Sequence, residues 1–116
     1  MKTLLHINEM EKWETVLGNA ARLAEFDRGQ TGGWAVEVVA NGPAVGGLTR
    51  ETAALLGISS EMEKLSAEGV TLVACRNALK ENGISEERLC PWVGVVASGV
   101  VELSLRQTKG FAYIKP

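Results

Sequence analysis

The sequence predicts an α/β fold built on a parallel sheet of five strands. Short apolar runs, typical of buried strands, alternate along the chain with segments whose apolar residues recur at helical spacing. The chain has 116 residues and neither an internal repeat nor a break in composition, so we expect a single domain over residues 1–116. Hydrophobic residues make up 46% of it and charged residues 22%, which is typical of a globular domain with a buried core.

The first strand and the first helix are predicted within residues 3–28. Residues 3–7 form an apolar run that we assign to the strand. Asn8 has the side chain of a helix N-cap, with Glu11 three residues later, and the helix that it starts ends near Arg28, before three closely spaced glycines. One face of this helix carries Met10, Trp13, Leu17, Ala20, Ala21 and Ala24.

The second strand is predicted at residues 34–40, and residues 41–43 after it have the Asn-Gly-Pro composition of a loop. A short helix follows, which Thr49 is expected to cap and which stops at Gly57.

A second short helix is predicted from the capping-box pattern of Ser60 and Glu63, and it stops at Gly69. The third strand, residues 70–74, leads directly into Cys75.

The helix after the third strand is predicted to end at Gly83, and Ser85 to cap a further turn through Leu89. Pro91 then precedes the fourth strand, residues 92–96.

The last helix is predicted to open at Ser98 and Gly99 and to close at Gly110, before a final short strand at residues 111–114. Its apolar residues are Val100, Val101, Leu103 and Leu105.

Charge and hydropathy exclude two classes of partner. Twelve basic and 14 acidic residues are mixed along the chain, with a net charge of −2, so no basic face is available to bind nucleic acid. The apolar run at residues 3–7 is interrupted by Glu9 and Glu11, which makes it too short for a signal-peptide core or a membrane span. We therefore expect a cytoplasmic protein that binds neither nucleic acid nor membrane.

The chemical motifs of several enzyme classes are missing. Two cysteines are too few for a disulfide framework and are interpreted as thiols. A single histidine and no Cys-x-x-Cys pair argue against a metal site. The glycine-rich residues 42–47 match neither a dinucleotide fingerprint nor a phosphate loop, and no Gly-x-Ser-x-Gly segment predicts a hydrolase.

Cys75 is the strongest candidate for chemistry because it stands where a strand ends and a helix begins. A thiol there faces the unpaired NH groups of the first helical turn, which favour a thiolate, and the neighbouring Arg76 adds positive charge. The alternative is that Cys75 is a small buried residue with a packing role, since unpaired cysteines are often buried.

Ligands of an open parallel sheet bind outside the carboxyl ends of its strands. By that rule residues 6–8, 41–43, 75–77 and 97–99 meet at one edge. The predicted site combines Cys75 with Asn41, Gly42, Arg76, Asn77, Ser98 and Gly99. The two Asn amides would orient a bound anion, and Ser98 and Gly99 would complete the pocket.

His6 and Cys90 have two interpretations each. A histidine in an apolar strand is commonly a neutral, hydrogen-bonded ring, but His6 is also placed to tune a nearby thiolate. Cys90 precedes Pro91 with no helix start behind it, which favours a structural thiol.

These segments together resemble the DsrE/DsrF-like family over nearly the whole chain. The resemblance lies in residues 39–44, 69–79, 99–102, 106–107 and 110–116. It implies a three-layer α/β/α domain that assembles as a trimer or as a hexamer of stacked trimers. It also implies that Cys75 matches the cysteine that accepts sulfane sulfur as a persulfide in the sulfur-relay members. Ala78 departs from the threonine that many relatives have, so a hydroxyl near the sulfur is missing.

Three functions follow as hypotheses. The first is a sulfur carrier, or sulfurtransferase, in which Cys75 takes sulfur from a donor protein and passes it to an acceptor without a cofactor. The second is a non-catalytic homo-oligomeric module that binds a small ligand or a protein between subunits. The third is a redox sensor in which Cys75 is oxidised or pairs with Cys90.

Overall fold

The computed structural model describes residues 1–116 and contains one five-stranded sheet with the strand order β4-β3-β2-β1-β5. All four pairs of neighbouring strands are parallel. The strands are β1 Lys2–Ile7, β2 Ala35–Ala40, β3 Thr71–Cys75, β4 Val93–Val96 and β5 Ala112–Ile114. The predicted α/β class and all five predicted strands are confirmed, with bounds that differ by no more than a residue.

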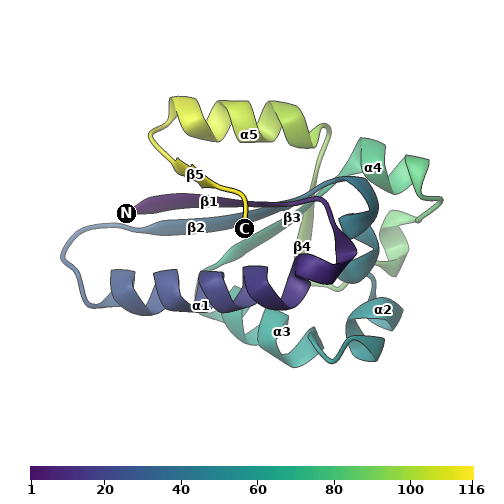
Figure 1. The fold of residues 1–116 in the computed structure, drawn as a ribbon, viewed down its shortest axis with the longest axis horizontal. Coiled ribbons are helices and arrows are strands. Elements are labelled where there is room, and N and C mark those ends of the chain that lie inside the picture. The colour runs from purple at the N-terminus through teal and green to yellow at the C-terminus, as the bar shows by residue number, and fades with distance from the viewer.

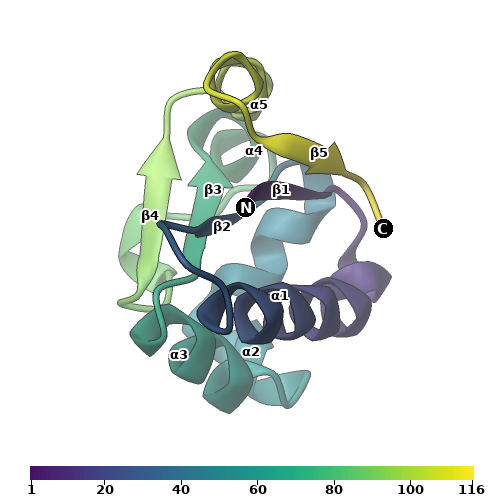
Figure 2. The same cartoon turned by 90° about the vertical axis from the view of Figure 1, so that its left-hand side faces the viewer.

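Helices cover both faces of this sheet and give the three layers (Figures 1 and 2). The α-helices are α1 Trp13–Arg28, α2 Arg50–Leu55, α3 Ser59–Ala67, α4 Arg76–Glu81 and α5 Gly99–Thr108. Short 3₁₀ helices are η1 Met10–Lys12, η2 Gly42–Leu48 and η3 Glu86–Arg88. None of the helices combines the length and the apolar composition that crossing a bilayer requires.

The strand order explains why α5 lies on the opposite face of the sheet from α1, α2 and α3 (Figure 2). From β1 to β4 the sheet grows in one direction, since each strand pairs with the strand before it in the chain. The last strand, β5, pairs instead with the free edge of β1, at the opposite end of the sheet. Connections between parallel strands are right-handed, so reversing the direction places the connecting helix on the opposite face. Figure 2 shows the result, with α5 above the sheet and α1, α2 and α3 below it.

The two faces carry cores of different size, because successive side chains of a strand point to opposite faces. Leu5 belongs to a cluster of 25 buried residues on the α1 side. Its neighbour Leu4 belongs to a cluster of four on the α5 side, with Val39, Val73 and Leu103. Apolar burial therefore holds α5 less firmly than it holds α1.

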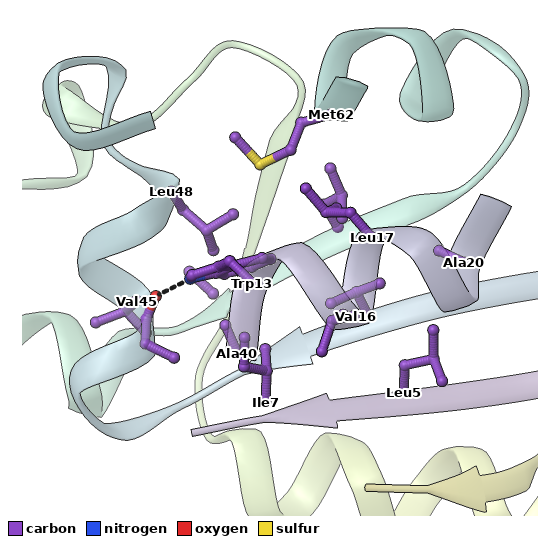
Figure 3. Close-up of a cluster of buried hydrophobic side chains, with 14 of the residues drawn as sticks. Leu5, Ile7, Trp13, Val16, Leu17, Ala20, Ala40, Val45, Leu48 and Met62 are labelled. Carbon is purple, nitrogen blue, oxygen red and sulfur yellow. Dashed lines mark hydrogen bonds between the residues drawn. The ribbon is translucent and has the colours of Figure 1, made fainter. Parts of the chain in front are cut away.

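Trp13 connects α1 to the segment that follows β2 (Figure 3). Its ring is 2% exposed, and its Nε1–H donates a hydrogen bond to the Ala44 carbonyl in η2 at 2.9 Å. A methyl group at Gly47 would lie 2.2 Å from Trp13 Nε1, so only glycine fits there. This contact fixes η2, and with it the carboxyl end of β2.

Two predicted features around this segment are wrong. Residues 41–43 are not simply a loop, because η2 starts at Gly42, and Pro43 is tolerated in its first turn, where no NH is needed. Asn8 does not cap the first helix, which begins with η1, and Glu9 precedes η1 without a side-chain cap. Asn8 packs instead against Gly42, where a Cβ would lie 3.3 Å from the Asn8 carbonyl oxygen.

The capping box predicted at Ser60 and Glu63 is also wrong. Ser60 lies inside α3, and the N-cap is Ile58, which has no side-chain cap bond. The helical hydrogen bonds already start at Ile58, whose carbonyl accepts from Met62 N. Ile58 is buried, so packing determines where the helix starts. The predicted caps Thr49, Ser85 and Ser98 do accept hydrogen bonds from backbone NH groups.

We predict that Gly47→Ala lowers the free energy of unfolding by about 2 kcal/mol or more, because the new methyl group displaces Trp13. The control is Gly18→Ala in α1, where no atom beyond the neighbouring residues and the backbone of the same helix lies within 4 Å of the added Cβ. That change is expected to raise stability by about 0.5–1 kcal/mol through helix propensity. Urea unfolding measures both, and equal stabilities for the two variants would contradict the role of the Trp13 contact.

Candidate functional site

A cleft of about 270 Å³ opens at the carboxyl ends of β2, β3 and β4, between the first residues of α4 and of α5. This is the edge of a parallel sheet at which ligands commonly bind. The residues that line the cleft are Asn41, Gly42, Cys75, Asn77, Ala78, Glu81, Ser98, Gly99 and Val100. The structure thus brings together Cys75 and every predicted site residue except Arg76.

Cys75 is the last residue of β3 and the N-cap of α4. Its backbone is extended, with φ −74° and ψ 119°, so the helix begins at the next residue. The residue is 6% exposed and packs against the larger core, but it also lines the cleft. Cys75 is therefore a buried residue that borders the cleft.

Gly99 lets α5 start directly against the ends of β2 and β3. A Cβ at Gly99 would lie 3.2 Å from the Cβ atoms of both Asn41 and Cys75. Ser98, just before it, caps α5 by accepting a hydrogen bond from Val101 N at 3.5 Å. Because no side chain intervenes, the first turn of α5 forms one wall of the cleft beside Cys75.

Asn41 is held from the other side by a chain of two hydrogen bonds. His6 Nε2 lies 2.9 Å from Asn41 Oδ1, and His6 Nδ1 lies 2.6 Å from the Tyr113 hydroxyl. Tyr113 is in β5, which pairs with β1 in a register that places it beside Leu4. His6 is thus a hydrogen-bonded, half-buried ring that contacts a residue of the cleft.

Arg76 does not take part in the cleft. Its Nε donates a hydrogen bond to Glu86 Oε2 at 2.7 Å, and both side chains are exposed. This pairing raises the pKa of Arg76 and lowers the pKa of Glu86. The sequence interpretation in which Arg76 stabilises the Cys75 thiolate has no support in this geometry, because the guanidinium is bound to Glu86 outside the cleft. The one charged residue that lines the cleft is Glu81.

Cys90 is 2% exposed and belongs to the larger core rather than to the cleft. Its backbone NH donates to the Leu48 carbonyl, and burial raises the pKa of its thiol. Both cysteines are free thiols. No three His, Cys, Asp or Glu side chains come close enough together to hold a metal ion.

A polar cluster under α5 was missed by the sequence analysis. Glu37 of β2 is 4% exposed, and its Oε1 lies 3.1 Å from Arg106 Nε in α5. Arg106 Nε also lies 2.8 Å from Glu102 Oε2, one turn earlier in α5. The signal in the sequence is Glu37 itself, the one charged residue within the apolar run of β2. This cluster joins α5 to the sheet where the apolar core is small.

Burial raises the pKa of Glu37 to about 8, assisted by a hydrogen bond to Glu102 and by the Glu102 charge, and opposed by Arg106. The pKa of Glu102 is lowered by the same hydrogen bond and by Arg106. The raised pKa of Glu37 favours its protonated form at neutral pH, while the lowered pKa of Glu102 favours the ionised form. Glu37 Oε2 is buried and accepts no hydrogen bond. A protonated carboxyl group can donate a hydrogen bond from this oxygen, which an ionised group cannot.

The raised pKa makes stability depend on pH. A carboxyl whose pKa is higher in the folded chain contributes stability that is present below its ordinary value of 4.5 and is lost as the pH rises through 8. We expect Glu37→Gln, which imitates the protonated form, to remove this loss. The variant should gain on the order of 2 kcal/mol relative to wild type between pH 5.5 and pH 9.

Urea unfolding of both proteins at the two pH values measures the effect. The matched control is Glu63→Gln, the same substitution at an exposed position of α3. If the difference between Glu37→Gln and wild type is the same at both pH values, the pKa of Glu37 is not raised in the folded chain.

Some residues of the site could not be found from sequence. Glu81 and Val100 line the cleft only because α4 and α5 start side by side there. Tyr113 reaches His6 because β5 pairs with β1, a strand 107 positions away along the chain. Strand order carries no local signal in the sequence, so these contacts required the structure.

Comparisons with known proteins agree with this fold. A sequence model of the DsrE/DsrF-like family matches residues 4–116. The chain is 31% identical to MTH1491 of Methanobacterium thermoautotrophicum, a protein of unknown function; the TM-score is 0.82, over 99% of this chain and 98% of that one. BT1422 of Bacteroides thetaiotaomicron, a conserved protein of unknown function, shares the fold at 13% identity with a TM-score of 0.74, over 99% and 94% of the two chains. A comparison with curated protein sequences gave no match.

Proposed function

Because the chain belongs to the DsrE/DsrF-like family, we propose that it is a sulfur carrier that holds sulfane sulfur as a persulfide on Cys75. Membership of this family is consistent with a role in sulfur relay. The observation that carries the proposal is the position of Cys75, at the wall of a cleft that the ends of β2 and β3 and the start of α5 form together. Residues 1–116 would act as one domain, without a cofactor.

The transfer consists of two thiol exchange steps. The Cys75 thiolate attacks the terminal sulfur of a donor persulfide, the donor's S–S bond breaks, and the donor leaves as a thiolate that takes up a proton. An acceptor thiolate then attacks the terminal sulfur on Cys75 and releases the Cys75 thiolate. One S–S bond forms as another breaks in each step, so no net oxidation or reduction occurs.

The cleft offers hydrogen-bond donors for the persulfide anion. Its lining residues include Asn41 and Asn77, which have side-chain amides, and Gly99 and Val100, which lie in the first turn of α5. No lysine or arginine lines it. Stabilisation of the bound sulfur would therefore come from amide dipoles and hydrogen bonds rather than from a neighbouring cation.

We also propose a homo-oligomer, a trimer or a hexamer, that meets donor and acceptor proteins in the cytoplasm. The outer side of α5 is apolar and open, with Val100, Val101 and Leu105 exposed by 69%, 55% and 50%. Val100 lies both on this surface and at the cleft. A second subunit or a partner that covers α5 would thus also cover the entrance to Cys75.

Sulfur loading tests the proposal directly. Incubation with a cysteine desulfurase and cysteine is expected to add the mass of one or more sulfur atoms to wild type and to Cys90→Ala, but not to Cys75→Ala. Intact mass spectrometry before and after reduction distinguishes a persulfide from other adducts. An adduct that persists in Cys75→Ala rules out Cys75 as the carrier, and absence of any adduct on wild type argues against the carrier function.

A non-catalytic homo-oligomeric binding module is the second candidate. It is favoured by the burial of Cys75, which is 6% exposed and packs within the larger core. In this function Cys75 would only pack, and the cleft or the α5 surface would bind a small ligand or a protein.

Alkylation separates the two candidates. A carrier is expected to show faster labelling of Cys75 than of Cys90, because only Cys75 lines the cleft. Peptide mass mapping after timed exposure to iodoacetamide gives the two rates. Equal, slow labelling of both thiols would favour the binding module.

A further inference from the structure

We propose that His6 is a positioning residue for Cys75: it holds the side-chain amide of Asn41 so that the amide NH₂ group, and not its oxygen, faces the sulfur. The inference deepens the proposed function and rests on it for its biological role. The hydrogen-bond geometry that carries it is independent of whether sulfur is transferred.

The first step is the orientation of Asn41. Its Oδ1 faces His6 Nε2 at 2.9 Å, so Nε2 must carry a hydrogen and donate it. The amide then directs Nδ2 to its other side, where it lies 3.5 Å from the position that a Cβ on Gly99 would occupy. The Cys75 Cβ lies 3.2 Å from that same position. The Asn41 amide nitrogen and the Cys75 Cβ therefore border the same space next to Gly99.

The second step is the tautomer of the histidine. In a neutral imidazole only one nitrogen carries a hydrogen, so with Nε2 as donor, Nδ1 is an acceptor. The Tyr113 hydroxyl lies 2.6 Å from Nδ1, and in this tautomer it donates to Nδ1. The contact with Tyr113 is thus compatible with the tautomer that holds Asn41 in this orientation. In the other tautomer Nε2 would accept, and the Asn41 amide would turn its oxygen toward the sulfur.

The third step is what this orientation does at the cleft. A carbonyl oxygen beside a thiolate or persulfide anion repels it, whereas an NH₂ group stabilises it by a charge-assisted hydrogen bond. The cleft has no cationic residue and includes Glu81, while the Arg76 guanidinium is bound to Glu86. A correctly turned Asn41 amide is therefore one of few groups that favour the anion.

The experiment measures the pH dependence of the alkylation rate of Cys75 with neutral iodoacetamide, in a Cys90→Ala background. We expect His6→Phe, which fills the same space without a donor, to move the midpoint of the profile up by about one pH unit. His6→Gln keeps an amide NH donor near the place of Nε2 and is expected to stay within about 0.3 unit of wild type. Asn41→Ala should shift the midpoint as far as His6→Phe does.

The double variant His6→Phe/Asn41→Ala distinguishes positioning from a merely structural effect. If His6 acts through Asn41, the double variant has the midpoint of Asn41→Ala alone; independent structural effects would add. Equal midpoints for wild type and His6→Phe, or additive shifts in the double variant, would overturn the proposal. If His6→Phe does not fold, as judged by circular dichroism, Tyr113→Phe takes its place. Tyr113 is 41% exposed, so its variant is expected to fold and to shift the midpoint upward by a smaller amount.

Sulfur loading of the same variants keeps this inference separate from the proposed function. Midpoint shifts as described, together with no sulfur adduct on any variant, leave the positioning intact and count against the carrier. An adduct on Cys75 with unchanged midpoints supports the carrier and overturns the positioning role of His6.

Discussion

The contact of Gly99 with the ends of β2 and β3 is the constraint on which the candidate site depends. Because residue 99 has no side chain, α5 can start directly beside Asn41 and Cys75. A Cβ atom on residue 99 would lie only 3.2 Å from the Cβ atoms of these two residues. A larger residue would move the helix away from the sheet edge or fill the space beside the sulfur. The cleft, its amide-bearing residues and the burial of Cys75 all depend on this close approach.

The rest of the molecule holds the two sides of that contact in place. On one side, the packing of Trp13 against Gly47 and its bond to Ala44 fix the segment after β2. On the other side, α5 has a small apolar core beneath it and is joined to β2 through Glu37 and Arg106. One side of the site is thus the well-packed segment after β2, and the other side is α5, which polar contacts hold to the sheet. The strength of these polar contacts changes with the protonation of Glu37.

The sequence predicted the positions of the five strands along the chain well, because buried parallel strands appear as short apolar runs between helical segments. It also placed Cys75, Asn41, Asn77, Ser98 and Gly99 at one sheet edge, since that edge is where strands lead into helices. It failed where tertiary packing decides. Asn8 packs on Gly42 rather than capping a helix, and Ile58 starts α3 ahead of the capping box. Arg76 pairs with Glu86, and Tyr113 reaches His6 through a strand pairing that no local pattern reveals.

The central claim is that the cleft at Cys75 holds a sulfur atom. A crystal structure of the protein after treatment with a persulfide donor tests it most directly. The account predicts electron density for one additional sulfur bonded to Cys75 Sγ, lying in the cleft within hydrogen-bond distance of Asn41 Nδ2. An unmodified Cys75, or additional sulfur on Cys90 instead, would contradict it.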